Sequence, residues 1–135
     1  SNLYHLHWNR DQGGGGKGGD FYNYSATNDD NVTLDRDDKN GPPGTETITI
    51  IRVRSGSYSY SVHDYSNSDN SSIAASSTKL ANSGATVTVY YNNSATKYSV
   101  PGGAGNLWRV FTFTESGGLT KVGTMTDQDT YTDVY

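Results

Sequence analysis

The chain has 135 residues, 32% of them hydrophobic, and a formal net charge of -4 at pH 7. This length fits one domain, and only 10 scattered Lys and Arg residues argue against a nucleic acid partner, because phosphate binding needs clustered positive charge. Zero Cys excludes disulfides and thiol catalysis, and no apolar run approaches the ~18 residues of a membrane-spanning helix.

Alternating apolar and polar residues predict an all-β fold of antiparallel sheets, arranged as a sandwich or a barrel. No window of eleven or more residues shows helical periodicity, and 11 Tyr, 2 Trp and 3 Phe supply surface for a core. In chain order, the clearest predicted strands are 45–54, 57–65, 85–91, 96–100, 107–114 and 119–125.

The first of these strands contains a slip in its apolar phase. Ile48 and Ile50 share one face, whereas Ile51 and Val53 share the other. A β-bulge after Ile50 would restore the register, so we expect one there.

The glycine run at 13–19, interrupted only by Lys17, is interpreted as a loop between two strands. It lacks the Lys-Ser/Thr pair that ends a phosphate-binding loop, and no helix follows it. His5, His7 and His63 could form a transition-metal site, but ordinary surface histidines explain the same pattern. No serine lies in a nucleophile-elbow context, so no catalytic residues are predicted.

Carboxylates are densest between residues 29 and 46, and this density predicts a calcium site. Calcium takes six to eight oxygen ligands, and loops rich in Asp and Asn supply them within a short span. The spacing does not fit an EF-hand, and solvated Asx turns are the alternative. The predicted ligands are Asp30, Asp35, Asp37, Asp38 and Glu46.

Four Asn-x-Ser/Thr sequons predict N-linked glycans, which would suit polar loops on an extracellular surface. They begin at Asn23, Asn31, Asn70 and Asn92. Some of them would arise by chance in a chain so rich in Asn, Ser and Thr.

Several segments in order resemble one known family. The segment 34–38 with sequence LDRDD, the following GPPGTETITI at 41–50, YSYSVHDYSN at 58–67, and WRVF at 108–111 carry the likeness. They resemble the Ig-like β-sandwich domains of bacterial surface and secreted proteins of the YfaP/DUF2135 type. The resemblance implies an extracellular location and a β-sandwich fold.

The two ends of the chain depart from the family pattern. The family's opening strand and its acidic pair have no counterpart, although His5-Leu6 matches the residues that follow them. Residues 126–135 read as an additional polar strand. We therefore expect a β-sandwich domain over 1–125 and a terminal extension strand over 126–135.

These features predict an extracellular or cell-surface structural protein rather than an enzyme. We expect a calcium-binding glycoprotein that assembles with itself into a fibril or matrix, in which one terminal segment, either 1–8 or 126–135, adds a strand to a neighbour. The alternative is a monomeric adhesin module that binds carbohydrate or a surface. A strand that folds back within its own chain favours the module, and one that reaches a neighbour favours the fibril.

Overall fold

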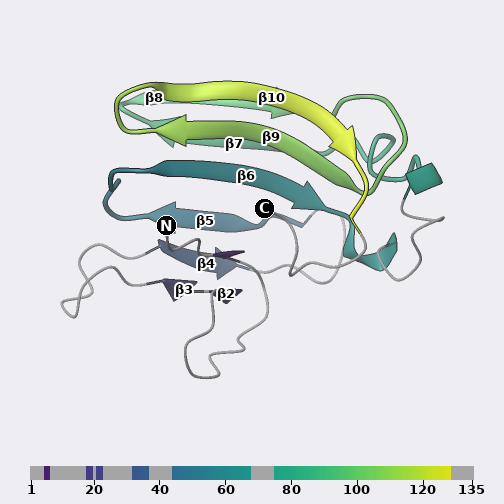
Figure 1. The fold of residues 1–135 in the computed structure, drawn as a ribbon, viewed down its shortest axis with the longest axis horizontal. Helices are drawn as coiled ribbons and strands as arrows, with labels where there is room; N and C mark the ends of the chain where they lie inside the picture. The colour runs from purple at the N-terminus through teal and green to yellow at the C-terminus, as the bar shows by residue number, and fades with distance from the viewer. Residues whose placement is uncertain are drawn as a thin grey trace. The chain divides into compact units, whose positions relative to one another are not determined.

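The computed structural model describes residues 5–6, 18–19, 21–22, 32–36, 44–67 and 75–128 (Figure 1). The fold is all-β, as predicted, and the described sheets are antiparallel except for one two-residue parallel pair. The chain divides into two compact units, Ser1–Arg54 and Ser55–Tyr135. No described segment forms a helix long and apolar enough to cross a membrane.

The described residues of the first unit form two small sheets. β4 (Val32–Arg36) lies between β3 (Phe21–Tyr22) and β5 (Thr47–Ile50) and pairs antiparallel with both. β1 (His5–Leu6) pairs in parallel with β2 (Gly18–Gly19). The end of the glycine run is therefore extended strand rather than the loop that its composition predicts, because glycine without a side chain also tolerates β geometry.

Apolar residues of β4 and β5 face each other across the strands. Val32 pairs with Ile50, and Leu34 pairs with Ile48. Val32 is buried, so this face of the pair forms the apolar side of the small sheet.

The predicted bulge after Ile50 is wrong. β5 ends at Ile50, and Ile51 is 55% exposed, so the phase slip marks the end of a strand. The register shift lies on β4 instead, between Leu34 and Arg36, where Asp35 is the extra residue opposite β5.

The second unit contains a three-stranded sheet and a hairpin. In the sheet, β9 (Leu107–Thr114) lies between β6 (Ser57–His63) and β10 (Gly118–Thr126). The hairpin joins β7 (Thr86–Tyr91) to β8 (Ser94–Ser99). β9 has the predicted bounds, and the other four strands end within two residues of the predicted positions.

A register shift places the tryptophan of β9 in the aromatic row of the sheet. Tyr60 pairs with Phe111, but two residues further along β6, Val62 pairs with Trp108, which leaves Val110 as an extra residue on β9. Trp108 therefore shares a face with Phe111 despite their odd spacing. Trp108 and Val110 are both buried, so the bulge adds apolar surface to the core.

The hairpin packs on the sheet through aromatic rings. The ring centroids of Tyr98 and Phe111 lie 5.6 Å apart, and those of Tyr91 and Phe113 lie 4.9 Å apart in an edge-on arrangement. Figure 1 shows the hairpin behind β9 and β10. The second unit therefore has two β layers with the core between them.

Candidate functional site

Of the five predicted calcium ligands, the structure describes two, Asp35 and Glu46. Both side chains are exposed. Asp30, Asp37 and Asp38 lie outside the described residues. Among the residues that the structure describes, no group of three or more His, Cys, Asp or Glu is arranged to hold a metal ion.

Asp35 projects from the bulge of β4 toward two threonines. The Thr33 hydroxyl donates to Oδ1 and the Thr49 hydroxyl donates to Oδ2, from directly paired positions on β4 and β5. These two hydrogen bonds, the Thr33 bond foremost, lower the pKa of Asp35 below its ordinary value of 3.8, although burial opposes them slightly. Asp35 is thus ionised at neutral pH and retains lone pairs for a cation.

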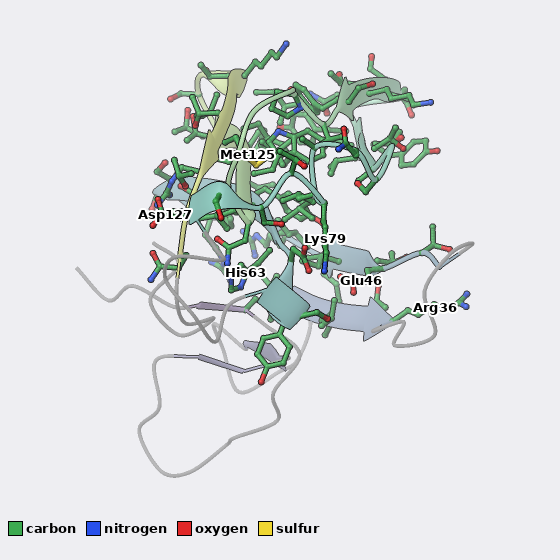
Figure 2. All side chains as sticks on the ribbon, turned by 90° about the vertical axis from the view of Figure 1, so that its right-hand side faces the viewer. Arg36, Glu46, His63, Lys79, Met125 and Asp127 are labelled. Carbon is green, nitrogen blue, oxygen red and sulfur yellow. The ribbon has the colours of Figure 1, made fainter. Side chains whose placement is uncertain are left out.

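Glu46 lies at the same end of the sheet as Arg36. Arg36 pairs with Thr47, the residue after Glu46, and Figure 2 shows both charged side chains at this end of β4 and β5. The guanidinium is a permanent positive charge, so it would compete with a metal ion for the Glu46 carboxylate.

A second polar cluster, which the sequence analysis missed, lies in the second unit around Asn106. The Asn106 side chain is 0% exposed, its Nδ2 donates to the Gln128 carbonyl oxygen (2.7 Å), and its Oδ1 accepts from the Gln128 N–H (2.7 Å). One side chain thus satisfies both backbone groups of the residue that follows β10 by two positions. We refer to Asn106, Gln128 and His63 as the Asn106 clamp.

His63 completes the clamp from the end of β6. Its Nε2 lies 3.2 Å from Asn106 Nδ2 and 3.2 Å from the Gln128 carbonyl oxygen. Without a proton, Nε2 accepts from Asn106. With a proton, it donates to Gln128, and both bonds cannot form at once. Figure 2 shows His63 and Asp127, the neighbour of Gln128, at the same end of this unit.

The backbone at Gly105 and Asn106 lies close to other backbone segments of the second unit. The Gly105 N–H donates to the Ser77 carbonyl (2.8 Å), and the Asp64 N–H donates to the Asn106 carbonyl (2.8 Å). Gly105 has φ +135°, and a Cβ there would lie 2.2 Å from the Thr126 carbonyl oxygen. A side chain at this position would overlap the end of β10, so glycine is required there.

Burial lowers the pKa of His63 below its ordinary value of 6.5, although the Gln128 carbonyl and the Asp64 carboxylate partly offset the effect. The unfolded chain therefore takes up a proton at higher pH than the folded chain. We expect stability to be full above pH 6.5 and to fall as the pH decreases from 6.5 through the lower folded-state pKa.

Thermal unfolding followed between about pH 8 and about pH 5 checks this expectation, since histidine titrates in that range. The matched variant is His63→Gln, which cannot titrate, and its melting temperature should change less over the same range. Parallel curves for the two proteins would contradict the role of His63.

One predicted glycosylation site, Asn92, lies in the described part of the chain, and Asn23, Asn31 and Asn70 lie outside it. Asn92 and Asn93 form the two-residue turn between β7 and β8, with φ 50° and 58°. Asparagine tolerates this left-handed conformation better than most residues, which suits a type I′ hairpin turn. Asn92 is exposed, so its amide is accessible at the tip of the hairpin.

Comparison of the chain with protein-family models, with curated proteins and with solved structures finds no match. The resemblance to Ig-like domains of bacterial surface proteins therefore stays a prediction.

Proposed function

We propose that the chain is a calcium-binding, glycosylated subunit of an extracellular polymer, and that subunits join by β-strand addition. The observation that carries this proposal is the two-stranded β7–β8 hairpin, because neither of its strands has a second partner among the described residues. An unpaired edge presents N–H and C=O groups to which another strand can bond.

The orientation of these groups follows from the hydrogen-bond pattern of the hairpin. The Val100 N–H donates to the Ala85 carbonyl (3.0 Å), and bonded pairs alternate with non-bonded pairs in an antiparallel ladder. The pair Thr86 and Ser99 is therefore non-bonded, as is every second pair after it. The backbone groups that point outward belong to Thr86, Thr88 and Tyr90 on β7 and to Ala95, Lys97 and Ser99 on β8.

The chain offers a segment of suitable composition to fill such an edge. Residues 129–135 have the sequence DTYTDVY, in which Thr, Tyr and Val favour strands and the two Asp discourage unspecific aggregation. The Asn106 clamp fixes Gln128, the residue before this segment. A contact between a tail and a neighbour's edge does not close on itself, so it would propagate into a filament.

Deletion of residues 129–135 tests the proposal. The predicted extension began at Thr126, but Thr126 pairs with Leu107 in β10 and Gln128 is bonded to Asn106, so a cut after Gln128 leaves the described fold intact. We expect the shortened protein to remain folded and monomeric, whereas the full chain forms filaments in negative-stain electron microscopy. Equal assembly of both proteins would contradict strand addition by this segment.

Calcium is expected to stabilise the fold through Asp35 and the neighbouring acids. A ligand bound only by the folded state adds RT ln(1 + [L]/Kd), or about 2.7 kcal/mol at a hundredfold excess over Kd. Chelation should therefore lower the melting temperature by several degrees, and Asp35→Asn should reduce that shift. The exposed Asp127, in the other unit, serves as control through Asp127→Asn. A melting curve unchanged by chelator would refute the calcium site.

A monomeric module that binds carbohydrate is the second candidate. The exposed ring of Tyr90 favours it, since aromatic faces pack on sugars. A full chain that stays monomeric at every calcium concentration and binds a soluble glycan would support this candidate over the polymer.

A further inference from the structure

The tip of the β7–β8 hairpin combines an accessible sequon with an exposed aromatic ring. Tyr90 is 81% exposed, more than any other large hydrophobic residue described as exposed. Two residues later, Asn92 opens the turn and begins the sequon Asn92-Asn93-Ser94. The open ring therefore places an aromatic face close to an accessible glycosylation sequon.

The alternation of the hairpin explains why Tyr90 is open. Tyr91 points inward and contacts Phe113, and Tyr90 therefore points to the opposite face. The residue paired with Tyr90 on β8 is Ala95, whose methyl group covers little of a neighbouring ring. No described side chain makes a ring contact or hydrogen bond with Tyr90.

The distance between the two residues suits a contact with the first sugar. Two residues of extended chain span at most about 7 Å, and a pyranose ring linked to Asn92 Nδ2 would extend over that distance if it turned back along β7. The left-handed turn places Asn92 at the tip of the hairpin, outside the paired residues of β7 and β8.

We infer that Asn92 carries an N-linked glycan and that the apolar face of its first N-acetylglucosamine packs on the ring of Tyr90. The inference rests on the proposed function in one respect only, that the chain is glycosylated. The C–H groups of the sugar pack on the aromatic face. The ring of Tyr90 is then shielded from water, which it is not in the chain without sugar. The glycan thus becomes part of the fold of the hairpin tip.

The test uses full-length protein made in a eukaryotic secretory host, with Asn23, Asn31 and Asn70 changed to Gln in every variant. Endoglycosidase treatment leaves one N-acetylglucosamine on Asn92. The sugar-free reference is Ser94→Ala, because it removes the sequon and retains Asn92 in the left-handed turn. Both forms are then compared in the Tyr90 protein and in Tyr90→Ala, with Tyr90→Trp as the conservative aromatic variant.

We expect the single sugar to raise the melting temperature by about 3–6 °C with Tyr90 or Tyr90→Trp, and by less than about 1 °C with Tyr90→Ala. Equal rises in all three backgrounds would overturn the contact, as would absence of sugar on Asn92 by glycopeptide mass spectrometry. Filament formation is followed separately for Ser94→Ala. If filaments form but the sugar does not change the melting temperature, the polymer proposal is supported and the contact with Tyr90 is refuted. If the sugar raises the melting temperature but no filaments form, the contact is supported and the polymer proposal is refuted.

Discussion

Replacement of Gly105 with alanine is expected to destabilise the protein by about 3–5 kcal/mol, since it combines a strained backbone with an overlap of atoms. The added Cβ would lie 2.2 Å from the Thr126 carbonyl oxygen and 2.8 Å from the Thr126 carbonyl carbon. These are backbone atoms of β10, so no side-chain rotation relieves the overlap. The strand end must shift, which also disturbs Gln128 in the Asn106 clamp.

Gly102 provides the matched control. It lies in the same loop, its Cβ position has no heavy atom within 4 Å, and no positive φ applies to it. Chemical denaturation should place Gly102→Ala within about 0.5 kcal/mol of the parent. If the two variants unfold at the same denaturant concentration, the close approach of Thr126 does not constrain the fold.

Replacement of Asn106 with leucine is expected to cost about 2–4 kcal/mol, because it removes the partner of both backbone groups of Gln128. Leucine has a similar size, so the loss would come mainly from the hydrogen bonds. Asn106→Asp is a sharper probe. It replaces the donor Nδ2 with an acceptor oxygen that faces the Gln128 carbonyl, originally at 2.7 Å.

Equilibrium unfolding in urea measures these changes, with the exposed Asn82→Leu as the control for polar-to-apolar substitution. A second measurement also tests the clamp. Because Asn106→Leu releases Gln128, proteolysis after β10 should become faster than in the parent protein. A stable Asn106→Leu protein with unchanged proteolysis would show that the clamp contributes nothing.

The strands of the second unit could be predicted because aromatic and β-branched residues recur there in short runs between turn-forming residues. β9 is the clearest case, since Trp108, Phe111 and Phe113 lie within a run that no Gly or Pro breaks. The expected strand at 96–100 begins two residues later than β8, because the sequence pattern leaves a four-residue loop at 92–95. The left-handed conformations of Asn92 and Asn93 allow a two-residue turn, so β8 begins at Ser94.

The first unit was harder to predict. β4 was absent from the clearest predicted strands because Asp35 and Arg36 interrupt its apolar pattern. The structure resolves this conflict with a bulge, which directs Asp35 toward two threonine hydroxyls. A register shift depends on the partner strand as well as on the local sequence, so sequence reasoning placed it on β5.

Asn106 could not be identified from the sequence. It follows a loop that contains Gly102, Gly103 and Gly105, and an asparagine in such a place is typical of an exposed turn. Its burial depends on Gln128, which lies 22 residues later. The closely spaced glycines before Asn106 are the signal that points to this site, since glycine often marks a close approach of backbone to backbone.

The Asn106 clamp can form only after almost all of the second unit has been synthesised. His63 and Gln128 are 65 residues apart, so their contact closes a long loop, and such non-local contacts form slowly. During synthesis from the N-terminus, β6, β7, β8 and β9 are all complete before Gln128 leaves the ribosome. Before β10 is complete, β9 can pair with β6 while its other edge is bare, and β10 then covers that edge. Exposure of this edge makes the interval before closure the period of greatest risk for misassembly between nascent chains.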